Sequence, residues 1–381
     1  MTEQKHKDGA NSRIQTTNRR DTLVGVLRAA WLIGGPLLVV AALVGGFLFL
    51  RDNALTAPKL LVAAIAIVWG VGGVIALFAL AATYVGHLRL SAQQRLSPFI
   101  FVGPAVLVLG LYLVYPTVET LYLSFLGPKS HQFVGLSNYI FAFTDESMTT
   151  SFRNNALWLI FGTGLSVGFG LLIAVLAERT AHWFELTVKS IIFMPMAISL
   201  VGASIIWLFV YAYRPPGSPQ IGILNAVLTG LGGQPQAWLL GQPWNTLFLI
   251  AILIWGQTGF AMVIFSAALK GVPLELVEAG RIDGGNESRI FFAITLPYIR
   301  GTVVMVTTTI VIFTLKIFDI VLTMTGGNYG TQVIANAYYD QQFKFFQPGR
   351  ASAIAIVLLL LVTPVMWYNL RNFRSQTEAF R

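Results

Sequence analysis

The stretch TLFLIAILIWGQTGFAMVIFSAAL, residues 246–269, contains no charged side chain. At about 1.5 Å per residue, a helix of this length crosses the roughly 30 Å hydrocarbon core of a bilayer. Residues 301–322 are as apolar, except for Lys316 and Asp319, which need a partner or a polar cavity in a membrane. The other uncharged segments of similar length are 31–50, 60–86, 97–118, 155–177, 190–213 and 351–370. The sequence therefore predicts an all-α bundle of about eight membrane spans.

The composition supports a polytopic membrane protein. Hydrophobic residues make up 55% of the chain and charged residues 11%, and the mean hydropathy is +0.70. An even number of spans puts both termini on one side. With the termini in the cytoplasm, 17 of the 25 Lys and Arg residues fall in cytoplasmic segments, as the positive-inside rule expects. Membrane orientation thus explains the net charge of +9, and no nucleic-acid partner is required.

Three regions differ in composition. Residues 1–23 are polar and lack the apolar core of a signal peptide, so they predict a disordered cytoplasmic tail. Residues 24–96 predict an N-terminal hairpin of two spans, and residues 97–381 a core of six spans. The chain has no cysteine, and its four histidines are scattered without the spacing of metal ligands. We expect no metal site.

The most informative cytoplasmic segment is residues 270–300, KGVPLELVEAGRIDGGNESRIFFAITLPYIR. Leu274, Val277 and Ile282 form an apolar stripe, which breaks at Gly284-Gly285. A second apolar piece then leads to the next span. The pattern predicts two short helices joined by a glycine turn and lying against the membrane face, although a simple connector between spans has the same periodicity.

This segment resembles the EAA loop of the permeases of binding-protein-dependent sugar ABC transporters, the family of the maltose and α-glucoside permeases. The family pattern EAAxxDGAxxxxxFxxxxLP is matched by Glu278-Ala279-Gly280, Asp283-Gly284-Gly285, Phe291 and Leu296-Pro297, with glycine in place of alanine at 280 and 285. The resemblance covers residues 98–378 and includes GLSNY (135–139), FDIVLTMTGG (318–327) and GRASAIAI (349–356). The N-terminal hairpin is similar to the two extra spans of the maltose permease subunit.

The resemblance implies that this loop transmits force from a separate ATPase subunit. The residues that it assigns to ATPase coupling are Glu278, Ala279, Gly280, Arg281, Asp283 and Gly284. The chain itself has no G-x-x-x-x-G-K-[ST] sequence to hold ATP phosphates, so we expect it not to be an enzyme and to hold no cofactor. ATP and Mg would bind to the ATPase. The family implies as partners a second permease subunit, two ATPase subunits and an extracytoplasmic solute-binding protein.

A sugar site in a membrane needs hydrogen-bonding groups and aromatic faces. Trp255, Gln257 and Thr258 lie in the middle of an otherwise aliphatic span, and Gln257 in particular needs partners there. The resemblance implies that Gln257 and Phe260 line the sugar site, together with Phe313, Thr314 and Ile317 on the next span. Each of these residues could instead serve only packing. The substrate expected is a disaccharide or small oligosaccharide, most simply an α-glucoside such as maltose, trehalose or sucrose.

Other functions remain open from the sequence. An ion-coupled secondary transporter would need a coupling-ion site and repeated halves, whereas the spans hold only Lys316 and Asp319, which are three residues apart and can pair on one helix face. We expect that pair to be structural or to act in gating. A permease for glycerol phosphate or a polyol is a further alternative. An intramembrane enzyme is disfavoured, because the spans hold no metal-ligand set, Ser/His pair or carboxylate dyad.

Overall fold

A computed structural model of the chain describes residues 34–53, 56–86, 90–128 and 132–379. The chain divides into two compact units, Met1–Pro116 and Thr117–Arg381. The described regular structure is helical, apart from an isolated antiparallel bridge between Leu126 and Phe133. This confirms the predicted all-α fold. The predicted regions, a tail over 1–23, a hairpin over 24–96 and a core over 97–381, stay a prediction. The tail lies outside the described residues.

The first unit is built from long apolar helices. The first of them, Gly34–Asn53, pairs with α2 through Trp69, whose Nε1 donates to the Leu43 carbonyl at 2.8 Å. Gly46 allows this approach, because a Cβ there would lie 2.1 Å from Trp69 Cδ1. The remaining elements are α2 (Lys59–Gly86), α3 (Leu90–Leu109), the π-helical turn η1 (Gly110–Val114) and α4 (Tyr115–Leu123), which continues into the second unit.

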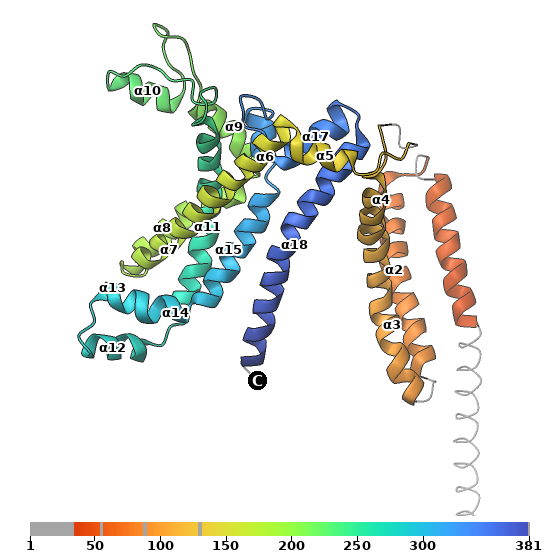
Figure 1. Ribbon diagram of the computed structural model, residues 1–381. Coiled ribbons are helices and arrows are strands. Elements are labelled where there is room, and N and C mark those ends of the chain that lie inside the picture. The colour runs from red at the N-terminus through yellow and green to blue at the C-terminus, as the bar shows by residue number, and fades with distance from the viewer. Residues whose placement is uncertain (1–33, 54–55, 87–89, 129–131, 380–381) are drawn as a thin grey trace, which may run out of the picture. The chain divides into compact units, whose positions relative to one another are not determined.

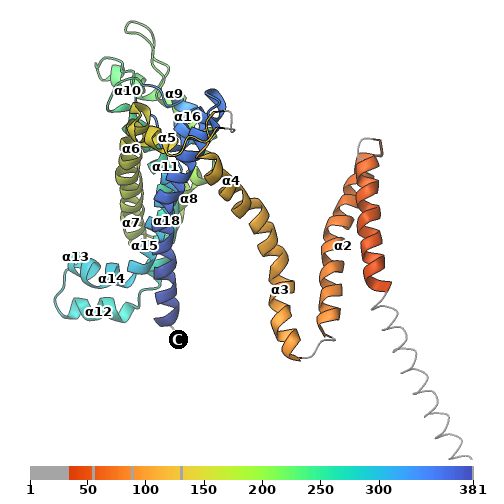
Figure 2. The same ribbon diagram turned by 45° about the vertical axis from the view of Figure 1, so that its right-hand side comes forward.

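The second unit carries the remaining spans and the loops between them (Figures 1 and 2). Its elements up to the predicted coupling loop are α5 (Ser137–Thr144), α6 (Glu146–Leu157), η2 (Trp158–Thr163), α7 (Gly164–Ala177), α8 (His182–Phe193), η3 (Met194–Ala197), α9 (Leu200–Val210), α10 (Ile223–Gly230) and α11 (Asn245–Lys270). The elements that follow are α12 (Leu274–Ile282), α13 (Glu287–Ile290), η4 (Phe291–Thr295), α14 (Leu296–Tyr298), α15 (Arg300–Leu315), α16 (Asp319–Met324), α17 (Ile334–Tyr339), η5 (Asp340–Lys344) and α18 (Pro348–Ala379).

The core of this unit surrounds α11. One apolar cluster joins α11 to α7 and α15 through Ala174, Met262 and Ile310, all fully buried. Two glycines bring the backbones close. A Cβ on Gly170 of α7 would lie 2.4 Å from the Ala261 Cβ, and a Cβ on Gly259 of α11 would lie 2.4 Å from the Ile192 carbonyl oxygen of α8. Helices α7, α8 and α11 therefore pack as a close group, as small residues at membrane helix interfaces allow.

Two spans predicted as continuous helices are broken. Helices α8 and α9 meet at 105°, around a 3-10 turn that contains Pro195, and Ser199 then caps α9 by accepting a hydrogen bond from the Gly202 amide. The predicted span 301–322 also ends early, since α15 stops at Leu315. The Asn155 side chain donates to the Leu315 carbonyl at 3.3 Å and so satisfies one end of the broken helix.

This second break corrects the predicted Lys316–Asp319 pair. Lys316 follows the end of α15 and is exposed, whereas Asp319 begins α16. The two side chains are therefore not on one helix, and among the described residues they form no ion pair with each other. Counted by length and apolarity, the described chain has six helices able to cross a membrane. The count rises to eight if two bent pairs each form one span, namely His182–Ala197 with Leu200–Val210 and Glu287–Tyr298 with Arg300–Leu315, the latter bent by 71°. The predicted number of about eight agrees with the upper count.

Candidate functional site

The segment 270–300 folds as a helix, a glycine turn and a second helix, as its sequence predicts. Helix α12 is followed by Gly284 at φ +80°, in the left-handed region that favours glycine. The amide of Gly285 donates to the Gly280 carbonyl at 3.0 Å, which closes the turn. Asn286 then caps α13 by accepting a hydrogen bond from the Arg289 amide at 2.8 Å. In Figure 1, α12 to α14 lie at the same end of the second unit as the C-terminal end of α18.

The two glycines that replace alanines of the family pattern lie at close contacts, Gly280 within α12 and Gly285 in the turn after it. A Cβ on Gly280 would lie 2.7 Å from the Ile294 Cδ1, and a Cβ on Gly285 would lie 2.8 Å from the Gly280 carbonyl oxygen. In this arrangement an alanine at either position would require a neighbouring group to shift.

The opposite face of α12 is open to solvent in the described chain. Leu274 is 62% exposed and Ile282 86%, although both are large apolar side chains. Glu278 is also exposed, and its carboxylate forms no hydrogen bond or ion pair with another described residue. Arg281 bonds Glu287 at 2.9 Å, and this hydrogen bond raises the pKa of the guanidinium. An exposed apolar face with a free carboxylate is suited to a protein partner.

We expect the turn to depend on Gly284. Gly284→Val forces a β-branched residue into the left-handed region, which costs about 1–2 kcal/mol and misplaces α12 relative to α13. Solute uptake by cells with equal membrane levels of each variant should therefore fall several-fold. Gly284→Asn is the matched control, because asparagine tolerates this conformation and should retain most uptake. Equal uptake by the valine and wild-type chains would show that the turn geometry is unimportant.

The six predicted substrate residues divide between buried and accessible positions. Thr314 is fully buried, and its hydroxyl accepts from Thr163 at 3.3 Å. Ile317 is 2% exposed and belongs to an apolar cluster against which Trp255 packs. Trp255 also meets Trp207 edge to face, with 5.8 Å between ring centroids. In this conformation these three residues serve packing.

The remaining three are Gln257 and Phe260, which are half-buried like Trp255, and Phe313, which is 37% exposed. Phe260 packs against the apolar cluster that joins α7, α11 and α15. The Gln257 amide forms no hydrogen bond with another described residue, although it lies in the middle of α11. An amide in that position is available to a ligand or to a neighbouring subunit. The assignment of these residues to a sugar site remains a prediction.

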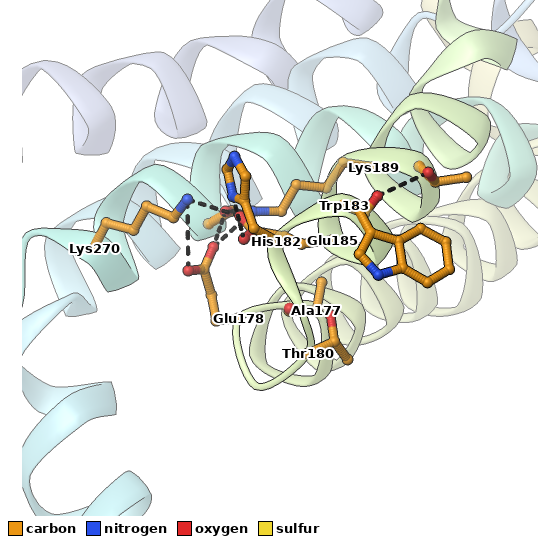
Figure 3. Close-up of polar contacts among 10 residues, drawn as sticks. Ala177, Glu178, Thr180, His182, Trp183, Glu185, Lys189 and Lys270 are labelled. Carbon is orange, nitrogen blue, oxygen red and sulfur yellow. Dashed lines mark hydrogen bonds and ion pairs between the residues drawn. The ribbon is translucent and has the colours of Figure 1, made fainter.

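Sequence reasoning missed a cluster of ion pairs at the junction of α7, α8 and α11 (Figure 3). Lys189 contacts Glu178 at 2.6 Å and Glu185 at 2.5 Å, and Lys270 contacts Glu185 at 2.7 Å. Ser266 is hydrogen-bonded to both Lys189 and Glu178. The only signal in the sequence is that each charge falls next to the end of a span.

Comparison with known proteins identifies the class of protein to which this chain belongs. Residues 166–374 match the family described as "Binding-protein-dependent transport system inner membrane component". The osmoprotective compounds uptake permease protein of Synechocystis sp. is 56% identical over 73% of this chain and 99% of its own. The α-glucoside transport system permease protein of Rhizobium meliloti is 51% identical over 75% of this chain and 84% of its own. A subunit of a bacterial ABC transporter involved in alginate import has the same fold, with a TM-score of 0.64, 18% identity, and coverage of 74% of this chain and 98% of that one.

The chain is thus a multi-pass permease subunit of an ABC importer. More particularly, it belongs to the family of binding-protein-dependent transport system inner membrane components. This confirms the family expected from the EAA-like loop.

Proposed function

We propose that the chain imports an α-glucoside, a disaccharide or small oligosaccharide such as maltose, trehalose or sucrose, by alternating access. The observation that carries the proposal is the 51% identity with an α-glucoside permease over three quarters of the chain. The 56% identity with a permease for osmoprotective compounds favours a second candidate, a small osmoprotective solute. Both candidates are polar solutes that need a hydrogen-bonding path across the membrane.

The energy for import comes from partner subunits in this proposal. The exposed face of α12, with Glu278 free, is the surface for an ATPase subunit that holds ATP and Mg. The other partners are a second permease, a second ATPase subunit and an extracytoplasmic binding protein. With α12 facing the ATPase, the C-terminal end of α18, which lies at the same end of the second unit in Figure 1, is cytoplasmic. This agrees with the distribution of Lys and Arg along the chain.

The substrate class is tested by uptake in cells that lack their own sugar importers and that express this chain with the genes encoded beside it. The proposal predicts uptake of labelled maltose, trehalose or sucrose, and competition among α-glucosides. Uptake of only a polyol or another osmoprotective compound would support the second candidate instead. A strain without the binding-protein gene controls for other routes of entry.

Gln257→Leu tests the route through the membrane. The change removes an amide that has no hydrogen-bond partner among the described residues, so the fold should tolerate it, whereas a sugar would lose at least one hydrogen bond. We expect the apparent KM for uptake to rise about tenfold, equivalent to roughly 1.4 kcal/mol, with unchanged membrane levels. Gln257→Asn should be less affected. An unchanged KM and maximal rate for Gln257→Leu would remove this residue from the substrate path.

A further inference from the structure

The ion cluster at the junction of α7, α8 and α11 is electrically balanced and closely packed. It holds two carboxylates, Glu178 and Glu185, and two ammonium groups, Lys189 and Lys270. The side chains of Glu185, Lys189 and Glu178 are 9%, 15% and 22% exposed, whereas that of Lys270 is 53% exposed. His182 adds an outer contact, with 3.6 Å between its Nδ1 and Glu185. The two pairs of Lys189 are therefore shielded and hold their geometry more strongly than exposed pairs, and Lys270 joins them from the solvent side.

The cluster lies where the coupling loop leaves the membrane core. Glu178 caps the end of α7, Glu185 and Lys189 lie on α8, and Lys270 is the last residue of α11 before the short link to α12. Figure 3 shows the four charged side chains converging from these elements. Each helix is already held to a neighbour farther along by the close approaches at Gly170 and Gly259. The ion cluster connects the ends of α7, α8 and α11 that lie nearest α12, where the segment 270–300 would transmit force.

A second, more exposed set of ion pairs continues from this cluster into the loop. Arg179, next to Glu178, contacts Glu287 of α13 at 3.6 Å, and Glu287 also pairs with Arg281 of α12. These three side chains are 51–53% exposed. Exposed pairs of this kind are weak and rearrange easily. A series of charged side chains therefore extends from Arg281 of α12 to Lys189 of α8. The pairs of Lys189 are shielded from solvent, and those in the loop are exposed.

Stability alone gives little reason for the shielded charges. Replacement of a buried ion pair by apolar residues is often neutral or stabilising, whereas removal of one partner leaves an uncompensated charge and is strongly destabilising. Charged groups instead fix which helix positions face each other. Here they fix the register of α7, α8 and α11 at the ends nearest α12.

We propose that Glu178, Glu185, Lys189 and Lys270 are positioning residues for energy coupling. They make the ends of α7, α8 and α11 move as one body when α12 is displaced, while the exposed Arg179–Glu287–Arg281 set allows the loop to adjust. This rests on the proposed function, since it requires an ATPase that moves α12. The proposal names a path by which a movement of α12 at Glu278 reaches α8, although the two helices are distant in the sequence.

The test reverses charges of the cluster in the complete transporter, reconstituted in proteoliposomes. Glu185→Lys alone and Lys270→Glu alone leave three like charges in the cluster. The fourfold exchange Glu178→Lys/Glu185→Lys/Lys189→Glu/Lys270→Glu keeps every ion pair of the cluster attractive. The measurement is the amount of solute imported per ATP hydrolysed, a ratio that a uniform loss of folded protein does not change.

We expect each single exchange to lower this ratio about tenfold and the fourfold exchange to return it to within about threefold of wild type, because interacting charges couple non-additively. The control is the exchange of Arg51 and Asp52, an exposed pair 2.7 Å apart in the first unit, which should leave the ratio unchanged. Single variants that keep the wild-type ratio would overturn the proposal. A fourfold exchange no better than the singles would do the same.

A single variant that fails to assemble is replaced by the neutral double variant Glu185→Gln/Lys270→Met. This variant should assemble, hydrolyse ATP and import less solute per ATP. Wild-type import per ATP by the neutral variant would show that the charges serve folding only, and would overturn the proposal. A wild-type transporter that hydrolyses ATP without importing any α-glucoside or osmoprotective solute would contradict the proposed function itself, which is a distinguishable result.

Discussion

Glu278→Lys is expected to abolish ATP-driven uptake while the chain still inserts into the membrane. Glu278 lies on the exposed face of α12, and its carboxylate forms no hydrogen bond or ion pair with another described residue, although its charge attracts that of Arg281. The substitution therefore removes only a weak, exposed charge interaction within the folded chain. At an interface, reversal of a charge that meets a complementary partner costs several kcal/mol. Loss of about 4 kcal/mol would weaken ATPase binding roughly a thousandfold.

The measurement is co-purification of the ATPase subunit with the tagged chain, alongside uptake. Glu275→Lys is the matched control, because it places the same charge on the same helix at an exposed position outside the family pattern, and most uptake should remain. Glu278→Gln should fall between the two. Normal uptake and normal ATPase recovery with Glu278→Lys would contradict the assignment of α12 to coupling.

The second large effect is expected at Gly259, where α11 and α8 come closest. A Cβ there would lie 2.4 Å from the Ile192 carbonyl oxygen and 2.8 Å from the Phe193 Cα. Both are backbone atoms, so relief of the overlap requires the helices to separate. We expect Gly259→Ala to destabilise the folded chain by about 1–3 kcal/mol, the usual cost of overpacking.

Gly256 provides the control for this prediction, since it lies one turn earlier on the same helix with no atom within 4 Å of an added Cβ. Gly256→Ala should be neutral or slightly stabilising, because alanine favours a helix by about 1 kcal/mol over glycine. The thermal unfolding midpoint of the detergent-purified chain distinguishes the two variants. Equal midpoints would mean that α8 and α11 do not pack as described.

Much of the fold follows from the sequence because a bilayer imposes a minimum length of apolar helix. The run 246–269 lies within α11, and the run 155–177 covers the end of α6, η2 and α7. The breaks could not be predicted in the same way. Residues 301–322 read as one span, but α15 ends at Leu315, where Asn155, far away in the sequence, donates a hydrogen bond to the freed carbonyl. Local composition does not encode that tertiary contact.

The site was predictable where its residues are close in sequence. The turn at Gly284 is specified by local patterns, and the structure has a turn there. The ion cluster was not predictable, because Glu178 and Lys270 come from helices separated by another span. The buried positions of Thr314 and Ile317 also depend on packing against other helices, which spacing along one span does not reveal.

The decisive measurement is accumulation of a labelled α-glucoside in proteoliposomes that contain either this chain alone or the chain with the second permease, the ATPase subunits and the binding protein. We predict accumulation only in the complete assembly, and only with ATP and Mg. Accumulation by the chain alone, driven by an ion gradient, would contradict the proposal that this permease is powered by a partner acting on α12.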